Sequence, residues 1–414
     1  MDYKFLPKED KEIFEAIKKE EKRQAEGMEL IASENYVSKA VLEAMANVLT
    51  NKYSEGYPGR RYYGGQEFVD VVENIAIERA KKLFGAEHVN VQPLSGSPAN
   101  AAVYMAFLNP GDKVLGLRLD HGGHLSHGHK VNFSGMLYNF VQYEVDVATG
   151  YVNMDKVRDI ALREKPKMIV AGYSAYSREI EWEKFKKVAD EVGAFTFADI
   201  AHTAGLIAAG EMENPTQIFD VVSTTTHKTL RGPRGAIIMC KEKFAKQIDR
   251  AVFPGMQGGP HEHIIAAKAV GFGENLKPEF KEYAKQVIKN AKVLADELIK
   301  MGYKIVSGGT DNHLMVVDMG GVGLNGREVE EILDKVGISV SRSTIPNDPN
   351  PPMKPSGVRL GTPAITTRGM KEEEVKKIAG WINEAISAKG DEAKLAEIRD
   401  EVREFCLKFP IWGI

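Results

Sequence analysis

The chain has little cysteine, no long apolar run and little net charge, and each shortage excludes a class of protein. Only two cysteines, Cys240 and Cys406, occur in 414 residues. They are too few for a disulfide framework and fit free thiols in a reducing compartment. No apolar run approaches the length that spans a bilayer. A net charge of −3, with 27% charged residues, gives no electrostatic basis for binding nucleic acid or a membrane surface.

The N-terminal segment is unlike a targeting sequence. Residues 1–23 alternate lysine, glutamate and apolar residues, whereas signal peptides carry an apolar core and transit peptides are poor in acids. We therefore expect a cytoplasmic protein. The length is sufficient for a large core and predicts two domains, and we find no internal repeat or low-complexity tract.

The first 84 residues change character twice. Residues 8–26 carry apolar side chains at helical spacing and predict an amphipathic helix. Residues 51–66 are dominated by tyrosine, glycine, arginine and proline, with no apolar period, and predict a long irregular loop. Such loops inside a folded chain are usually functional or form an interface. Helical periodicity returns over residues 67–84.

Short apolar strands alternate with helices between residues 88 and 255. The expected strands are residues 114–117, 168–171, 195–198 and 235–239. Helical stretches such as 181–193 separate them. This alternation predicts an α/β fold with a mainly parallel central sheet wrapped by helices.

The remaining chain predicts a smaller α+β domain. One long helix over 277–302 precedes a strand at 313–318 and helices at 326–336 and 371–388. We therefore expect three parts. They are an N-terminal helical arm at 1–50, a large α/β domain at 51–279 and a small C-terminal α+β domain at 280–414.

Lys228 is the residue with the clearest potential for chemistry. It follows an apolar run, 219–222, and lies in a turn rich in hydroxyls and small residues, with Arg231 and Arg234 close behind. A lysine becomes nucleophilic when it is desolvated and placed beside other cations, which is what a Schiff-base enzyme needs. Taken alone, a lysine in such a turn is more often a surface charge, and only the rest of the chain favours the Schiff-base role.

Asp199 lies at the C-terminal end of a buried strand, where parallel sheets bind their ligands. It precedes Lys228 by about one strand–helix–strand unit, so adjacent strands could bring the two together. Pyridoxal phosphate needs this pair, because a lysine forms the imine and a carboxylate keeps the ring nitrogen protonated. Alternatively, Asp199 could only cap a helix.

Two glycine-containing turns could bind anions. Ser95, Gly96 and Ser97 precede an apolar helical stretch at 101–108, and a helix N-terminus offers free N–H groups to a phosphate. An ordinary helix cap is the alternative. The second turn, at 255–260, is also able to present backbone donors.

A run of histidines and a single arginine complete the candidates. Residues 121–129 contain four histidines, a pattern that suggests a metal. No cysteine and only Asp120 accompany them, so we expect no metal and favour an imidazole stacked on a flat cofactor. Arg359 stands in a turn-rich setting, where it could hold a substrate carboxylate through two hydrogen bonds or lie on the surface.

The chain resembles serine hydroxymethyltransferases nearly from end to end, and seven segments in the same order carry this resemblance. They read LIASEN at 30–35, NKYSEGYP at 51–58, RYYGG at 61–65, GGHL at 122–125, DIAH at 199–202, THKTLRGPRG at 226–235 and QGGP at 257–260. Each segment alone is a weak signal, and seven in the same order are specific. The resemblance implies the aminotransferase-like fold, known as fold type I, of pyridoxal phosphate enzymes. It also implies a homodimer with active sites shared between subunits, and leaves pairing into tetramers open.

The resemblance assigns roles to individual residues of this chain. Lys228 would carry pyridoxal 5'-phosphate as an imine, Asp199 would pair with the ring nitrogen and His124 would stack on the ring. The other cofactor contacts would be Ser95, Gly96 and Ser97 at the phosphate, His202 and Ser174 at the phenolic oxygen, Thr225 and His227, and Gly258 and Gly259 from the partner chain.

Substrate contacts are implied in the same way. Arg359 would bind the amino acid's carboxylate near Ser33, and Tyr53 and Glu55 would come from the partner chain, with Tyr63 lining the same pocket. The pteridine of tetrahydrofolate would rest near Leu119, Gly123 and Leu125.

The implied activity is reversible transfer of the serine hydroxymethyl carbon to tetrahydrofolate, giving glycine and 5,10-methylenetetrahydrofolate, with Glu55 as general acid or base. A folate-independent pyridoxal phosphate aldolase acting on β-hydroxy amino acids is the nearest alternative. A cofactor-free binding protein would need loss of the lysine or a basic surface stripe, and neither is found.

The chain departs from the family pattern mostly where folate would bind. Residues 341–343 read Ser-Arg-Ser where the family usually has Asn-Lys-Asn, and residues 351–353 read Pro-Pro-Met where Ser-Pro-Phe is common. Asp120 replaces a small residue and Pro98 a glutamine. We therefore predict an intact cofactor and amino-acid half, and altered affinity for the one-carbon carrier or a different carrier.

Overall fold

A computed structural model describes residues 3–411, which divide into two compact units. The large unit comprises residues 40–285 and 345–347, and the small unit comprises residues 3–39, 286–344 and 348–411 within the described chain. These units divide the chain at residues 39 and 285 and include residues 3–39 in the small unit, whereas the three parts expected from the sequence, with boundaries at 50 and 279, stay a prediction. None of the helices within residues 3–411 combines the length and apolarity needed to cross a bilayer.

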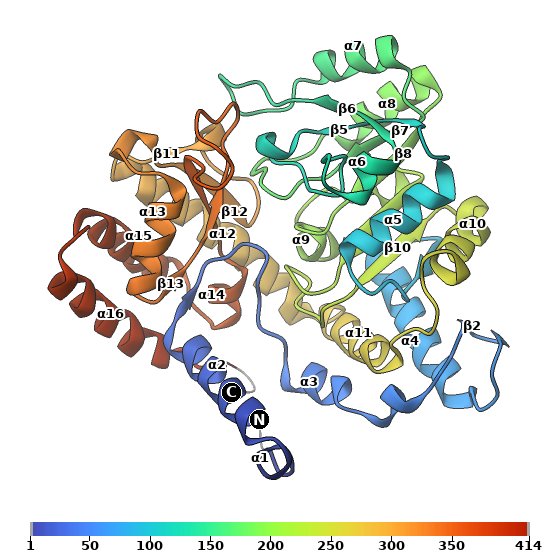
Figure 1. The fold of residues 1–414 in the computed structure, drawn as a ribbon, viewed down its shortest axis with the longest axis horizontal. Helices are drawn as coiled ribbons and strands as arrows, with labels where there is room; N and C mark the ends of the chain where they lie inside the picture. The colour runs from blue at the N-terminus through green and yellow to red at the C-terminus, as the bar shows by residue number, and fades with distance from the viewer. Residues whose placement is uncertain (1–2, 412–414) are drawn as a thin grey trace. The chain divides into compact units, whose positions relative to one another are not determined.

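The large unit is built on a seven-stranded sheet in the order β4-β10-β9-β8-β7-β5-β6. Figure 1 shows this sheet with β5, β6, β7, β8 and β10 labelled. Strands β5 to β9 run parallel, and β10 pairs antiparallel with β9 and β4. The strands are β4 (His88–Asn90), β5 (Lys113–Leu117), β6 (Asn139–Tyr143), β7 (Met168–Ala171), β8 (Phe195–Asp199), β9 (Val221–Thr225) and β10 (Ala236–Cys240). This is the mainly parallel α/β sheet that the alternation predicts, and β4, β6 and β9 were not among the expected strands.

Helices cover both faces of this sheet. Alternate residues of one strand enter different cores: Ile169 of β7 packs in one cluster with α4, α7, α8 and α11, and Val170 packs in the other with α5 and α10. Both faces are therefore buried, which explains the nearly continuous apolar strands. The helices of this unit are α3 (Lys39–Met45), α4 (Glu67–Phe84), α5 (Gly96–Phe107), α6 (Phe133–Leu137), α7 (Met154–Glu164), α8 (Trp182–Val192), α9 (Ala204–Ala208), α10 (Ala245–Arg250) and α11 (Glu262–Asn275).

The segment expected as an irregular loop contains a short hairpin. Strands β2 (Gly56–Tyr57) and β3 (Arg60–Arg61) pair antiparallel, and a 3-10 turn, η1 (Val48–Asn51), precedes them. Further short turns are η2 (Leu119–His121), η3 (Pro215–Gln217), η4 (Glu242–Phe244) and η5 (Ala251–Met256). Backbone pairing thus gives residues 56–61 order that composition alone did not indicate.

The small unit has an antiparallel four-stranded sheet in the order β11-β12-β15-β14 and a parallel pair, β1 with β13. Its strands are β1 (Met28–Glu29), β11 (Lys304–Ile305), β12 (Leu314–Asp318), β13 (Ile338–Ser339), β14 (Ser341–Ser343) and β15 (Gly357–Gly361). Its helices are α1 (Leu6–Glu9), α2 (Lys11–Glu26), α13 (Gly326–Lys335), α14 (Pro363–Thr367), α15 (Glu372–Ser387) and α16 (Glu392–Leu407), with turns η6 (Val306–Gly308) and η7 (Gly320–Val322). The α+β character agrees with the sequence.

Two predicted helices differ in detail. The helix expected over 8–26 is interrupted, because Asp10 is extended and its side chain accepts the N–H of Ile13 to cap α2. The long helix expected at 277–302 is α12 (Pro278–Lys300), which begins in the large unit and continues into the small one.

Candidate active site

A cavity of about 230 Å³ opens at the carboxyl ends of β7, β8 and β9 in the large unit. Parallel sheets bind ligands at this edge. The cavity collects most of the expected cofactor contacts: Ser95, Gly96, Ser97, His124, Ser174, Asp199, His202, Thr225, His227 and Lys228. Asn100, His127, Tyr173, Ala201 and Arg234 also line it. The spacing argument that joined Asp199 to Lys228 therefore agrees with the geometry.

Asp199 is held as a carboxylate by a set of donors. Asn100 Nδ2 lies 2.8 Å and His127 Nε2 3.0 Å from its Oδ2, and the N–H of Ala201 donates to Oδ1. Burial alone would raise the pKa of Asp199, but the hydrogen bond and charge of His127, and the charge of His124, lower it below the usual carboxyl range. Such a group can pair with a protonated ring nitrogen.

Gly172 permits this arrangement at the end of β7. Its φ of +118° is in the region that favours glycine, and an added Cβ would lie 1.9 Å from the carbonyl oxygen of Asp199. The strand ends that carry Asp199 and Ser174 can approach each other only because residue 172 has no side chain.

The two central histidines are fixed by neighbours. His124 Nδ1 accepts the N–H of Ser126 at 3.1 Å and lies 2.7 Å from its hydroxyl. The rings of His124 and His127 pack edge to face with centroids 5.6 Å apart. A fixed ring orientation at the cavity wall suits the stacking role expected of His124. His127, in contrast, was not singled out from the sequence, although it lies in the quoted histidine run.

The helix N-terminus at Ser95 suits an anion. Ser95 is the N-cap of α5, and its side chain makes no capping hydrogen bond. Its hydroxyl and the first N–H groups of the helix are thus available to a phosphate. A Cβ on Gly96 would lie 2.9 Å from Thr225 Cγ2, so glycine keeps the cradle open.

Lys228 is carried by a tightly closed turn after β9. The N–H of Arg231 donates to the carbonyl of Lys228, and the N–H of Gly232 donates to that of Thr226. Thr229 Oγ1 donates to the carbonyl of His202 at 2.9 Å, tying the turn to the segment after β8. The lysine stem therefore leaves a rigid backbone at the cavity.

Of the two arginines expected beside Lys228, Arg234 is at the cavity and Arg231 is not among its lining residues. Arg234 lines the cavity, whereas the Arg231 guanidinium lies over the ring of Tyr283, 4.6 Å from its centroid. Burial, followed by the charges of Arg234 and Lys228, lowers the pKa of His227 to about 3. His227 is therefore a neutral imidazole at physiological pH.

A second group of expected residues does not belong to the described lining of this cavity. It gathers elsewhere in the large unit: Tyr63 Oη lies 3.4 Å from Glu55 Oε2, and the rings of Tyr53 and Tyr63 pack edge to face at 5.4 Å. An added Cβ on Gly258 would lie 3.0 Å from Glu55 Oε1, and one on Gly259 would lie 3.1 Å from the Tyr53 ring. The residues expected from the partner chain thus form one cluster.

This cluster is exposed. Tyr53 is 58% and Tyr63 47% accessible. Large aromatic side chains exposed together typically mark an interaction surface.

Arg359 and Ser33 both lie in the small unit. Arg359 is on β15, and burial lowers its pKa to about 10. The N–H of Gly361 donates to the carbonyl of Leu30, so the segment before Ser33 packs along β15. The two expected carboxylate contacts are therefore carried by neighbouring segments of the same unit, and a desolvated guanidinium favours an anionic ligand.

The expected pteridine contacts surround His124 in the chain. Leu119 is in η2, Leu125 is 45% exposed and Gly123 packs too closely for a Cβ, which would lie 2.3 Å from the carbonyl oxygen of Leu117. His121 Nε2 lies 3.3 Å from Asn347 Oδ1 in the same unit. None of the three expected residues is among the described lining of the cofactor cavity.

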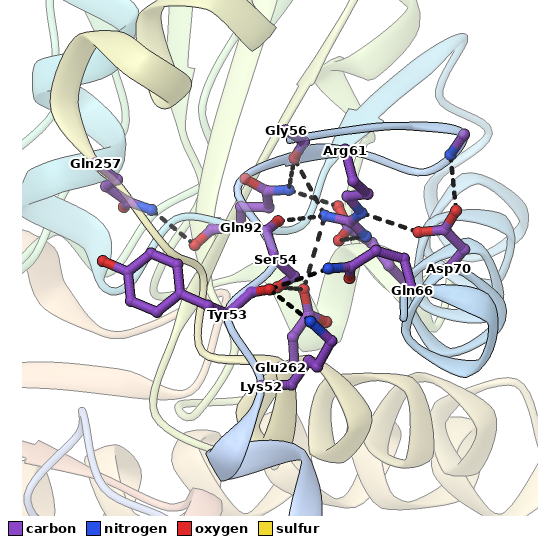
Figure 2. A network of polar contacts seen from close by, with 12 residues as sticks. Lys52, Tyr53, Ser54, Gly56, Arg61, Gln66, Asp70, Gln92, Gln257 and Glu262 are labelled. Carbon is purple, nitrogen blue, oxygen red and sulfur yellow. Dashed lines mark hydrogen bonds and ion pairs between the residues drawn. The ribbon is translucent and has the colours of Figure 1, made fainter. Parts of the chain in front are cut away.

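A buried charged network supports the exposed cluster and was missed by the sequence analysis (Figure 2). Arg61 donates to Glu73 Oε2 at 2.7 Å and to Asp70 Oδ1 at 2.9 Å, and Ser54 Oγ donates to Glu262 Oε1 at 2.6 Å. Ser54 and Glu262 are 208 residues apart in the chain, and Arg61 precedes its two acidic partners by 9 and 12 residues, so no helical or strand period reveals the network.

The cavity fits pyridoxal phosphate better than a metal. His124, His127 and Asp199 do offer ligand atoms within 4.8 Å of one another. However, Asp199 Oδ2 and His127 Nε2 are already hydrogen-bonded to each other, and Lys228 and Arg234 add positive charge to the same cavity. An ionised carboxylate, an amine and a glycine-lined helix N-terminus instead match a cationic ring, an aldehyde and a phosphate.

Fold and cavity together define the class: a pyridoxal phosphate-dependent enzyme of fold type I. The family model of serine hydroxymethyltransferase matches residues 6–382, and the chain belongs to the serine hydroxymethyltransferase family. It is therefore a glycine hydroxymethyltransferase by family, a pyridoxal phosphate-dependent transferase of one-carbon groups that connects serine, glycine and folate.

Proposed function

We propose that the protein reversibly transfers the hydroxymethyl carbon of serine to tetrahydrofolate, giving glycine and 5,10-methylenetetrahydrofolate. The observation that carries this proposal is the presence of Lys228 and the ionised Asp199 in one cavity of a chain that belongs to this family. The first supplies an amine for an aldehyde and the second stabilises a cationic ring.

The cofactor would be held by residues of the large unit. Lys228 would bind it as an imine, Asp199 would pair with the ring nitrogen, His124 would stack on the ring, and Ser95, Gly96 and Ser97 would bind the phosphate. Ser174 and His202 would contact the phenolic oxygen, and Thr225 and His227 would complete the lining. When bound, pyridoxal phosphate withdraws electrons from the bond that breaks at the substrate's Cα.

Substrate handling falls to three further groups of residues. Arg359, with Ser33, would hold the carboxylate of serine or glycine in a bidentate contact. The Glu55 carboxyl would hold and return a proton at the hydroxymethyl oxygen, with Tyr53 and Tyr63 beside it. Leu119, Gly123 and Leu125 would contact the pteridine.

We infer a homodimer in which each subunit completes its partner's site. The clustering of Tyr53, Glu55 and Tyr63 with Gly258 and Gly259 on an exposed surface supports this arrangement. Both cysteines are free and buried, which supports the cytoplasmic location that we propose.

Activity measurements test the proposal. Purified protein with pyridoxal phosphate, serine and tetrahydrofolate should form glycine and 5,10-methylenetetrahydrofolate, and the reverse reaction should be measurable. Cleavage of serine or another β-hydroxy amino acid that is faster without folate than with it would contradict the proposal and favour the aldolase.

A further inference from the structure

Glu262 is a buried acid at the first residue of α11, beneath the loop that carries Tyr53 and Glu55. Its side chain is fully buried, and its Oε1 accepts the hydroxyl proton of Ser54 at 2.6 Å (Figure 2). Arg61 Nη1 lies 3.8 Å from the same oxygen. Neither the cofactor contacts nor the substrate contacts proposed above involve this residue.

The loop is anchored by backbone contacts to the same network. Arg61 Nη1 donates to the carbonyls of Ser54 and Gly56, and Gln66 Nε2 donates to the carbonyl of Tyr53. Gln92 Nε2 donates both to the carbonyl of Gly56 and to Glu73. The carbonyls of residues 53, 54 and 56 therefore all receive donors from buried side chains.

Side-chain direction makes Ser54 the anchor between two outward-facing residues. Ser54 is fully buried, whereas Tyr53 is 58% exposed and Glu55 is partly exposed. Successive side chains of an extended segment point to opposite sides, so fixing Ser54 inward fixes its two neighbours outward. Of residues 53–55, only Ser54 has a fully buried side chain, and the hydroxyl of that side chain donates to Glu262.

The charges of the network favour a neutral Glu262. Arg61 supplies one positive charge against three carboxyl groups, those of Asp70, Glu73 and Glu262. Burial, and then the charge of Glu73, raise the pKa of Glu262 to about 8. Its Oε2 is buried without a hydrogen-bond partner in the described chain, which costs far less for a neutral carboxyl than for a carboxylate.

We propose that Glu262 is a positioning residue: through Ser54 and together with Arg61, it fixes Tyr53 and Glu55 where they complete the active site of the partner subunit. This inference rests on the proposed function and adds a residue to it. The connection extends to the neighbouring turn, because Gln257 Nε2 donates to the carbonyl of Gln92 and immediately precedes Gly258.

Three variants separate positioning from folding. Glu262→Gln keeps an acceptor for Ser54, and we expect kcat within about threefold of the wild type. Glu262→Ala removes the acceptor, and we expect kcat to fall roughly 10- to 100-fold, as small displacements of catalytic groups do. Ser54→Ala deletes only the hydroxyl, and we expect about a fivefold fall, corresponding to one hydrogen bond. If Glu262→Ala does not fold, Ser54→Ala still tests the loss of the same hydrogen bond.

Two readouts distinguish this role from general damage. The absorption spectrum of the bound cofactor should be unchanged in all three variants, because none of the hydrogen bonds described for the network involves Lys228 or Asp199. Glu262→Gln should have a kcat near that of the wild type and Glu262→Ala a lower one, whereas the KM for serine should change little in either variant. Equal losses in both Glu262 variants, or none in Glu262→Ala and Ser54→Ala, would overturn the proposal.

Mixed dimers test whether Glu262 acts on the active site of its own subunit or on that of the partner subunit. In a hybrid of a Glu262→Ala chain and a Lys228→Ala chain, the first chain keeps its lysine and receives an intact loop from the second. Activity of the mixture should therefore exceed that of either variant alone, as it should for the matched control pair Glu55→Gln with Lys228→Ala.

Recovery in the control pair but not in the Glu262 pair would show that Glu262 acts on its own chain's pocket, and would overturn the inference while the proposed function stands. An inactive wild-type protein would instead contradict the proposed function.

Discussion

His127 Nε2 lies 3.0 Å from Asp199 Oδ2, and both side chains are buried at the wall of one cavity. Asn100 donates to the same oxygen and is itself fixed by the hydroxyl of Ser223, which donates to its Oδ1 at 2.7 Å. This arrangement keeps Asp199 ionised, which is the condition for stabilising a cationic ring. His127 thus contributes most to keeping Asp199 ionised, although His127 itself would not touch the substrate.

Replacement of His127 should weaken cofactor binding. His127→Phe preserves the ring volume and removes the hydrogen bond and charge that lower the pKa of Asp199, so that pKa should rise toward the value that burial favours. We expect the affinity of the apoprotein for pyridoxal phosphate to fall about tenfold, or roughly 1–2 kcal/mol. Absorbance titration measures this, with Asp199→Asn as a comparison in which the loss should be larger. Unchanged affinity in His127→Phe would mean that Asn100 and the N–H of Ala201 suffice.

Glu262 should make stability depend on pH in a defined direction. In the unfolded chain its carboxyl titrates near 4.5, and in the folded protein the pKa is about 8. The unfolded chain thus loses a proton that the folded protein retains, and the contribution present below pH 4.5 is lost as pH rises to about 8. The charged groups around it are Arg61 from β3, Glu73 from α4 and Lys268 from α11 itself.

The comparison with Glu262→Gln isolates this effect. The variant lacks the titrating proton, so its free energy of unfolding relative to the wild type should increase from pH 5 to pH 8 and then level off. Urea unfolding at a series of pH values measures the difference. A difference independent of pH over this range would show that Glu262 is ionised in the folded protein.

Arg368 should be a major contributor to the stability of the small unit. Its guanidinium is buried and donates to the carbonyls of Ala25 and Gly27 at the C-terminal end of α2, and of Cys406 and Phe409 at the end of α16. Cations are favoured at the C-terminal ends of helices, where carbonyls lack partners.

We expect Arg368→Met to lower the free energy of unfolding by about 3–5 kcal/mol, since several buried carbonyls lose their donors. Arg368→Lys should recover part of this, because lysine offers three donors. Denaturant unfolding compares the two variants. A loss below about 1 kcal/mol in Arg368→Met would indicate that water or side chains replace the guanidinium.

Ser343 should weaken the contact with the one-carbon carrier. It is short, lacks the amide of the asparagine usual in the family, and its hydroxyl donates to the carbonyl of Thr344. We expect Ser343→Asn to lower the KM for tetrahydrofolate about three- to tenfold, the value of one hydrogen bond, with the KM for serine unchanged. Ordinary saturation of the wild type by tetrahydrofolate, together with no effect of Ser343→Asn, would show that this departure from the family is harmless.

The sequence predicted the parts of the fold that follow from local patterns. Helical periodicity located α4 and α8, and apolar runs located β5, β7, β8 and β10 to within a residue or two. Strands β4, β6 and β9 were missed, because polar residues interrupt or shorten their apolar runs and pairing with neighbours defines them.

The residues of the candidate site could be predicted only where a chemically suitable side chain stands at a recognisable place in the sequence, such as the end of a strand. Asp199 and Lys228 end or follow adjacent strands, and the sheet brings them to one cavity. Arg61, Glu73 and Glu262 meet through tertiary packing over some 200 residues, which no local period encodes. His127 was hidden in a run whose glycines give no regular spacing.

The most direct measurement of the central claim is the absorption spectrum of the purified protein with pyridoxal phosphate. The account predicts a visible band that borohydride removes and that is absent in Lys228→Ala, because the chromophore depends on an imine with that amine. A protein that stays colourless when the cofactor is supplied, or a Lys228→Ala variant with the same band as the wild type, would contradict it.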